Sequence, residues 1–400
     1  MENHPLTPIL SPEFDLDEHS RQVIRSVHEK ELAKALALPT DDPRDPKRRK
    51  RVEYTWDEMW AQPDVIQNTL LREKQAISEA AQYLARRPID RIVMAGCGDS
   101  LASMIGVRMA YEKLLGVQTE PIQALDFAYY YNSYINTRTL VITLSSSGAT
   151  TRTVEAMMIG RKKGAQSLTL SNTSGSPLMV EADQGLLIHA ERKGWPTQSS
   201  TAAMATLLQF LIEYARAKGL DTTEINRYQS TLDQIPDMMK ATLTTTNELI
   251  QQIAQKEHER NFYLFAGSGP CYAAALFGAA KVKECTPDRS LAIHMEEFHH
   301  YNSLKAGDPL FIIAPDGYSL PRAIDTARES KRWGGQIYSV VTGKNSALND
   351  FSDVVIRLPV IDEEFSALVY TMPVQLFGYH VAMEKFKQAE IEIRKIRGFH

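Results

Sequence analysis

Cysteine is scarce in this chain, which has only three among its 400 residues: Cys97, Cys271 and Cys285. They lie far apart, and no two of them have the spacing of a Cys-x-x-Cys motif. We therefore expect neither a disulfide framework nor a cysteine zinc site, and a reducing cytoplasm is the predicted compartment.

Long apolar runs and a strong charge of either sign are also missing. No stretch approaches the roughly 18 uninterrupted apolar residues of a membrane span, and the first residues do not follow the pattern of a signal peptide. The formal net charge is only −4, so the chain has no overall basic field that would attract nucleic acid. We expect neither a membrane nor a nucleic acid as partner.

What the chain does have is an ordinary globular composition, with 43% hydrophobic and 24% charged residues and a length that suits two domains. Residues 1–54 are rich in proline and charge, and they include the basic run 47–51. Such a run could bind nucleic acid, but no aromatic residues are interleaved with it. We interpret residues 1–54 as an extended, solvated N-terminal arm that could pack on a partner subunit.

Helical periodicity over residues 56–87 is followed by short apolar runs that alternate with helical segments. Continuous rather than alternating apolar runs indicate strands buried on both faces, hence a parallel sheet with helices on either side. The expected strands are 91–96, 139–144, 167–170 and 185–190, and the expected helices are 100–115, 151–163 and 200–218.

The same order of segments returns in the second half of the chain. The first glycine turn recurs after 171 residues, from Gly96 to Gly267, and a later strand recurs at the same offset, from Leu170 to Val341. A repeat of this length indicates a duplicated domain rather than a solenoid. We predict a first domain with a leading helix over residues 55–220. Residues 221–400 would hold a connecting helix, the second domain and a C-terminal tail.

A serine-rich loop, residues 144–150, lies between a predicted strand and a predicted helix and is called the serine loop below. Hydroxyl groups, free backbone N–H groups and the positive end of a helix dipole together suit a phosphate without any lysine. Open α/β sheets also bind their ligands at such strand ends. The same residue types are typical of a helix cap with a flexible turn, so composition alone leaves both interpretations open.

Three other hydroxyl-rich loops follow strands of the first domain: residues 96–100, 171–177 and 196–201. With the serine loop, their sequences (GCGDS, SSSGAT, SNTSGSP and QSSTAA) resemble the ligand loops of SIS (sugar isomerase) domains. The tandem arrangement is similar to the isomerase half of glutamine–fructose-6-phosphate aminotransferase, over about residues 55–390. The resemblance implies two tandem SIS domains, each an α/β, flavodoxin-like three-layer sandwich with a parallel sheet flanked by helices.

The resemblance also implies a sugar-phosphate substrate and the residues that hold it. The serine loop would bind the phosphate, and the glycine turn and the later helix start would contribute further hydroxyl groups. The second domain has the sequence APDGYS in place of a serine loop, so one phosphate site per chain is expected. The implied binding residues are Ser100, Ser145, Ser146, Ser147, Thr150, Ser200 and Thr201.

Glu284 and His300, which are 16 residues apart, have side chains suited to moving a proton between C1 and C2 of a sugar. In SIS relatives a glutamate at the Glu284 position is the proton-transfer base, and a histidine at the His300 position assists at the sugar ring from the neighbouring subunit. The resemblance therefore implies a homodimer or higher homo-oligomer with shared active sites. From the residue types alone, Glu284 could equally be a solvated charge at a helix end, and His300 could be a hydrogen-bonded structural histidine.

The segment around His300 also contains His294, His299 and two glutamates, which are possible metal ligands. Their spacing is not regular on a helix and the SIS family needs no metal, so we expect no metal and no cofactor. His294 and His299 are interpreted as structural.

Two departures from the aminotransferase pattern limit the expected activity. No N-terminal cysteine nucleophile or amidotransferase half precedes the first domain, so the full synthase reaction is not expected. The C-terminal tail of the aminotransferases contains a lysine that enters the sugar site. In this chain the corresponding position falls near Arg397, and Lys395 lies two residues before it. Because arginine cannot form a Schiff base, only a contact between this tail and the sugar is considered.

The leading hypothesis is therefore cleavage of the C–N bond in a phosphorylated fructosamine (an Amadori compound) or an amino-sugar phosphate. Proton transfer between C1 and C2 would give an imine that water hydrolyses, as in a deglycase or deaminase. The alternatives are a simple aldose–ketose isomerase of phosphosugars and a non-catalytic sugar-phosphate sensor.

Overall fold

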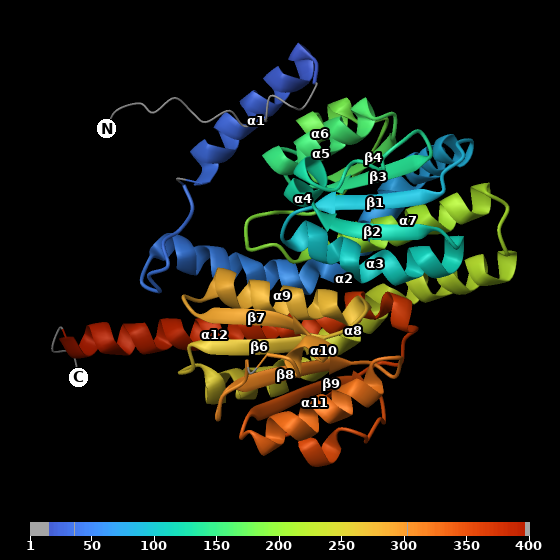
Figure 1. The fold of residues 1–400 in the computed structure, drawn as a ribbon. Helices are drawn as coiled ribbons and strands as arrows, with labels where there is room; N and C mark the ends of the chain where they lie inside the picture. The colour runs from blue at the N-terminus through green and yellow to red at the C-terminus, as the bar shows by residue number, and fades with distance from the viewer. Residues whose placement is uncertain (1–15, 36, 302, 397–400) are drawn as a thin grey trace.

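The computed structural model describes residues 16–35, 37–301 and 303–396. Two α/β units are stacked with a layer of helices between their sheets, as Figure 1 shows. Each unit contains a parallel five-stranded sheet, so the predicted fold class is confirmed.

The first sheet has the strand order β2-β1-β3-β4-β5, and all of its strands are parallel. Alternate residues of its central strand β1 face two separate cores, Ile92 and Met94 on the inner side and Val93 and Ala95 on the outer side. The strands are β1 (Arg91–Gly96), β2 (Gln118–Gln123), β3 (Thr139–Leu144), β4 (Gln166–Ser171) and β5 (Gln184–Leu187).

Helices cover both faces of this sheet. The inner core contains side chains of α3 (Asp99–Leu115) and α7 (Gln198–Ala217). The outer core contains those of α4 (Ala124–Tyr129), α5 (Thr151–Lys162) and α6 (Pro177–Glu181). This order is the flavodoxin-like 2-1-3-4-5 arrangement, which places its ligand site at the carboxyl ends of the central strands.

The second unit repeats this topology, with the order β7-β6-β8-β9-β10. Its strands are β6 (Phe262–Gly267), β7 (Arg289–His294), β8 (Pro309–Ala314), β9 (Gln336–Thr342) and β10 (Val354–Leu358). Its helices are α9 (Pro270–Cys285), α10 (Met295–Phe298), α11 (Leu320–Arg332) and α12 (Ser366–Ile396), with short 3₁₀ turns η1 (Asn349–Phe351) and η2 (Glu363–Phe365). Both units enter their first helix through a glycine of the same conformation, Gly98 (φ 55°, ψ −129°) and Gly269 (φ 55°, ψ −135°).

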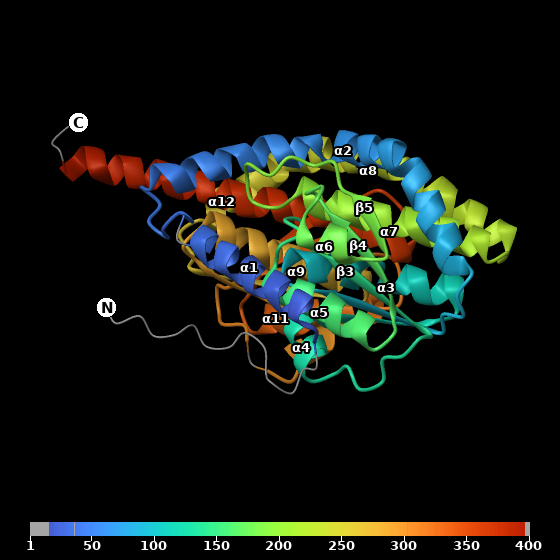
Figure 2. The same cartoon turned by 90° about the horizontal axis from the view of Figure 1, so that it is seen from above.

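The two units share one continuous core, because α3 of the first packs directly on α9 of the second. At Gly106 of α3 a side chain would come within 3.2 Å of Met204, Ala273 and Ala367, so only glycine allows this close approach. The connecting helix α8 (Thr222–Glu257) packs on α12, and Figure 2 shows the long helices α2, α8 and α12 running side by side along one side of the molecule.

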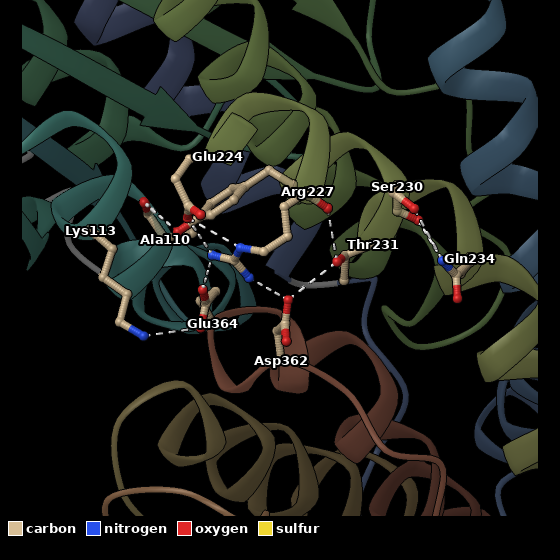
Figure 3. A network of polar contacts seen from close by, with 10 residues as sticks. Ala110, Lys113, Glu224, Arg227, Ser230, Thr231, Gln234, Asp362 and Glu364 are labelled. Atoms are coloured by element: carbon tan, nitrogen blue, oxygen red, sulfur yellow. Dashed lines mark hydrogen bonds and ion pairs between the residues drawn. The ribbon is translucent and has the colours of Figure 1, made fainter. Parts of the chain in front are cut away.

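A polar network ties the connecting helix to both units (Figure 3). Arg227 of α8 forms ion pairs with Asp362 and with Glu364 at 2.9 Å, and both carboxylates belong to the second unit. Lys113 of α3 reaches the same Glu364 at 3.2 Å. Burial opposes the charge on Glu364, but the hydrogen bonds from Arg227 and Lys113 lower its pKa below the usual value.

The expectation of an extended arm over residues 1–54 is wrong where the structure has helices, over residues 18–35 and 46–54. Residues Glu18–Ala35 form helix α1, which packs on α5, and helix α2 runs without a break over Pro46–Ala85. Asp45 caps α2 by accepting a hydrogen bond from the Lys47 N–H at 2.8 Å, and Pro46 at the first helical position is preorganised for a helix. The basic run 47–51 is therefore the first turn of a helix, and α2 crosses the predicted boundary between residues 54 and 55. The boundary between residues 220 and 221 stays a prediction.

Within the described residues, no helix combines the length and apolar character that crossing a bilayer requires.

Candidate active site

A cavity of about 450 Å³ lies at the carboxyl ends of β1 and β3, where the loops of the first unit meet α2 and α9. Its wall combines residues far apart in the sequence, from Arg51 of α2 to Glu284 of α9. The structure brings together at this cavity most of the residues predicted from the sequence: Ser100, Ser145, Ser146, Ser147, Thr150, Ser200 and Glu284.

The serine loop has a compact internal arrangement of hydroxyl groups. The Oγ of Ser145 lies 2.8 Å from Thr150 Oγ1 and 3.3 Å from Ser147 Oγ, and Ser147 Oγ also accepts the Ala149 N–H at 3.2 Å. Arg192 adds a positive charge, since its Nη1 donates to Ser146 Oγ at 3.3 Å. Donors of these kinds around one point suit a phosphate.

The loop over residues 171–177 supports the serine loop from behind rather than lining the cavity. The Asn172 N–H donates to the Ser146 carbonyl at 3.1 Å, and Ser171 Oγ reaches the same carbonyl at 3.4 Å. Gly148 has a φ of 61° and lies against Ser176, whose Oγ would be 1.9 Å from an added Cβ. These contacts pack the serine loop closely against the loop over residues 171–177.

Glu284 is the last but one residue of α9 and reaches the cavity from the second unit. Its carboxylate forms an ion pair with Lys281, one turn before it on the same helix. The Lys281 ammonium is fully buried and also lies 3.0 Å from Asp99 Oδ2 of the first unit. One buried cation thus joins two carboxylates from different units at the edge of the cavity.

Burial raises the pKa of Glu284 to about 7, with a further upward contribution from Asp99 and an opposing one from Lys281. Burial opposes the charge on Lys281, but the two carboxylates raise its pKa above the usual range. Because 24% of the Glu284 side chain remains accessible, this carboxyl can exchange protons with a ligand near neutral pH. A group of this kind is suited to general acid–base catalysis.

Two predicted residues do not line this cavity. Thr201 is fully buried on α7, and its hydroxyl donates to Gln62 Oε1 at 3.1 Å and so packs α7 on α2. His300 lies just beyond α10, is exposed, and contacts Glu296 Oε1 at 3.2 Å. Within one chain, the structure therefore does not bring His300 to Glu284.

The remaining predictions concern the tail and the neighbouring histidines. Lys395 belongs to α12, but its side chain and Arg397 lie outside the described residues. His299 contacts Glu329 at 2.6 Å and Thr326 at 3.0 Å, and His294 stacks on Tyr272 with ring centroids 3.5 Å apart.

The loop of the second unit that corresponds to the serine loop holds a carboxylate instead of an anion site. Glu363 accepts the Tyr318 N–H at 3.2 Å and lies against Gly317. A negative side chain at this place would repel a phosphate.

Sequence reasoning missed several charged residues of the cavity, namely Lys34, Arg51, Glu58, Asp99 and Arg192. Asp99 was part of the quoted GCGDS sequence, and Lys281 precedes Glu284 by three residues, which places the two side chains on one helix face. Arg51 and Glu58 lie on a helix that precedes both sheets, so no local pattern connects them with the site.

The comparison with known families agrees with this geometry. The family model described as SIS domain matches residues 87–213 and again residues 258–385, together more than half of the chain. The chain belongs to the SIS domain family. Both matches fall on the repeated α/β units, so each unit is one SIS domain.

Among curated proteins, the SIS chain is 28% identical over 332 residues to glutamine–fructose-6-phosphate aminotransferase (isomerizing) of Pyrococcus horikoshii, covering 82% of this chain and 54% of the relative. The Escherichia coli protein of the same name is 28% identical over 345 residues, with coverage of 83% and 56%. The chain thus spans about half the length of these relatives.

Solved structures share the tandem SIS fold. The C-terminal domain of glucosamine-fructose-6-phosphate aminotransferase from Francisella tularensis aligns with a TM-score of 0.74 at 23% identity, covering 83% of this chain and 96% of that one. Glucosamine-6-phosphate deaminase from Thermotoga maritima aligns with a TM-score of 0.65 at 20% identity, with coverage of 85% and 95%.

Proposed function

We propose that this chain is a phosphosugar enzyme that cleaves the C–N bond of a phosphorylated fructosamine or amino sugar. The observation that carries the proposal is the cavity itself. Its wall combines a cluster of hydroxyl donors with the Glu284 carboxyl, whose pKa burial raises to about 7. The first suits a phosphate, and the second suits proton transfer at carbon near neutral pH.

The serine loop anchors the phosphate in this proposal. Ser145, Ser147 and Thr150 donate hydrogen bonds, and Arg192 beside Ser146 adds positive charge. Ser100 and Ser200 contribute hydroxyl groups along the wall of the cavity. The sugar chain then extends from the serine loop towards Glu284.

The chemical steps follow from the position of Glu284. For a fructosamine, which has a carbonyl at C2 and the amine on C1, the Glu284 carboxylate removes a proton from C1 to give an enaminol. Protonation at C2 gives an imine between C1 and nitrogen. Water adds to C1, the C–N bond breaks, and an aldose phosphate and a free amine are released. Lys281 and Asp99 position the Glu284 carboxylate throughout.

The curated relatives support nitrogen chemistry as well as phosphosugar binding. Their names describe a fructose-6-phosphate aminotransferase with an isomerizing activity. Proton transfer between C1 and C2 and a bond between sugar carbon and nitrogen are common to that reaction and to the cleavage proposed here.

His300 takes part in this proposal only from a second subunit, because within its own chain it is exposed and outside the cavity. The protein then acts as a homodimer at least, with His300 of one chain assisting at the sugar ring in the cavity of the other. Mixing inactive Glu284→Gln and His300→Ala variants tests this point. Mixed dimers should regain part of the activity, whereas mixtures that stay inactive would exclude shared sites.

Turnover assays test the proposed reaction. The protein is incubated separately with fructosyl-glycine 6-phosphate, glucosamine 6-phosphate and fructose 6-phosphate, and hexose phosphates and free amines are measured. Amine release from one of the first two substrates is the expected result. Interconversion of hexose phosphates alone would indicate an aldose–ketose isomerase, and binding without turnover would indicate a sensor; either result would contradict C–N cleavage.

The phosphate anchor is tested by Ser147→Ala. Loss of a hydrogen bond to a charged group should weaken phosphosugar binding by about 1–3 kcal/mol. Ser174→Ala, an exposed serine in the loop behind, is the matched control and should bind as the unmodified protein does. Equal binding by both variants would exclude the serine loop as the anchor.

A further inference from the structure

Arg51 lines the cavity from the first turns of α2 and has no role in the steps above. Its guanidinium lies over the indole ring of Trp195, 3.5 Å from the ring centroid. Within the described part of the chain it has no hydrogen bond or ion pair, so its five N–H donors are available to a ligand.

The platform under Arg51 is fixed by contacts from the same helix. Glu58 Oε1 accepts the Lys193 and Gly194 N–H groups at 2.6 and 3.0 Å, and Thr55 Oγ1 accepts the Trp195 N–H at 2.8 Å. A side chain at Gly194 would lie 2.6 Å from the Thr55 backbone, so the loop approaches α2 as closely as it can. These contacts attach the loop that carries Trp195 to α2.

Arg51 and Glu284 line the same cavity. Burial lowers the pKa of Arg51, and Glu284 makes the largest opposing contribution. Arg192 is the cation beside the serine loop, at Ser146. The cavity thus contains one arginine beside the serine loop and a second arginine that interacts electrostatically with Glu284.

The positive charge of Arg51 would be complemented by a ligand that has an anionic group close to the reacting carbons. A sugar phosphate whose phosphate lies at the serine loop has no negative group there. A fructosamine formed from an α-amino acid does, because its carboxylate follows the nitrogen on C1 by a single carbon. The planar guanidinium matches a carboxylate with two parallel hydrogen bonds.

We propose that Arg51, held on Trp195, is the specificity-determining residue that binds the carboxylate of an amino-acid-derived fructosamine phosphate. This inference rests on the proposed function and makes its substrate class more precise. Substrates with an anion at both ends are then preferred over glucosamine 6-phosphate, which has only its phosphate.

A pair of stable analogues tests the proposal by binding alone. The first is 1-(carboxymethylamino)-1-deoxyglucitol 6-phosphate, which has no carbonyl and cannot react, and the second is its neutral carboxamide. Calorimetry on the full chain should show the carboxylate analogue binding about 10- to 100-fold more tightly. In Arg51→Met, whose side chain can still pack on Trp195, the two analogues should bind equally, and Arg51→Lys should restore part of the preference.

Lys50→Met is the matched control, since Lys50 is exposed on the same turn and its loss should leave the preference unchanged. Equal affinity of the unmodified protein for both analogues would overturn the role of Arg51, as would an Arg51→Met variant that weakens both to the same degree. Turnover of fructosyl-glycine 6-phosphate would still support the proposed function in either case. If neither analogue binds, the proposed function fails and this inference fails with it.

Discussion

Glu284 depends on two side chains that decide what it can do at neutral pH. Lys281 holds the carboxylate in place, and Asp99 from the other unit shares the same ammonium. The sequence could point to Glu284 through its resemblance to SIS relatives. It could not show that Asp99 shares Lys281 with it, because the contact between Asp99 and Lys281 joins residues 182 positions apart, on helices of different units.

Replacing Glu284 by glutamine should abolish turnover and leave phosphosugar binding within about twofold. The amide keeps the size of the side chain but cannot accept a proton from carbon. Steady-state kinetics and calorimetry on the same preparation measure the two effects. Lys283→Gln, at the exposed neighbouring position, serves as control and should stay fully active; an active Glu284→Gln variant would remove Glu284 from the mechanism.

The pH dependence follows from the raised pKa of Glu284. A base must be ionised to accept a proton, so kcat/KM should rise about tenfold per pH unit below about 7 and level off above it. Because Asp99 contributes to the upward shift, Asp99→Asn should move this midpoint to lower pH. A midpoint that is the same in both proteins would assign the titration to another group, such as the substrate phosphate.

Among the elements, the central strands could be predicted from the sequence, whereas the edge strands β2 and β7 could not. β1, β3 and β8 are mainly continuous apolar runs because helices cover both of their faces. β2 and β7 lie at sheet edges, and their polar, mixed sequences carry no such signal. The sequence also carries no helical signal for α1 or for the first turns of α2, where charged residues predominate, although both segments contribute to the cavity wall.

The glycine turn before α3 gives a prediction at this scale. Gly98 has a backbone conformation that other residues rarely adopt, so Gly98→Ala should lower the free energy of unfolding by about 1–3 kcal/mol. It should also weaken phosphosugar binding, because Asp99 and Ser100 follow directly. Urea unfolding and calorimetry measure the two effects.

Gly269 provides the matched control, since it has the same conformation in the second unit and its loop does not line the cavity. Gly269→Ala should lose similar stability and bind normally. If both variants lose binding to the same extent, the effect of Gly98 is general destabilisation rather than a displaced site.

At the scale of the whole molecule, the cavity exists only because the two units are packed together. Its hydroxyl loops come from the first unit, Glu284 comes from the second, and α2 closes the wall. The repeat was visible in the sequence, but a repeat does not specify how two copies face each other. The packing of α3 on α9 through Gly106 determines that arrangement.

The Arg227 network of Figure 3 is expected to stabilise this packing. Arg227→Leu removes the ion pair with the buried Glu364, which keeps its ion pair with Lys113. The variant should lower the free energy of unfolding by about 1–3 kcal/mol, towards the lower end of this range because solvent screens the partly exposed Arg227. The folded pKa of Glu364 lies below its unfolded value, so this stability is present above about pH 4.5 and is lost on acidification. Urea unfolding at pH 7 and pH 3.5 measures the difference, and an equal loss at both pH values would contradict the electrostatic explanation.

The central claim is that one cavity holds the phosphate at the serine loop and the reacting carbons at Glu284. The most direct test is a crystal structure of Glu284→Gln with uncleaved fructosyl-glycine 6-phosphate. The account predicts the phosphate within hydrogen-bond distance of Ser145, Ser147 and Thr150, with C1 and C2 beside residue 284. A phosphate bound elsewhere, or sugar carbons directed away from residue 284, would contradict it.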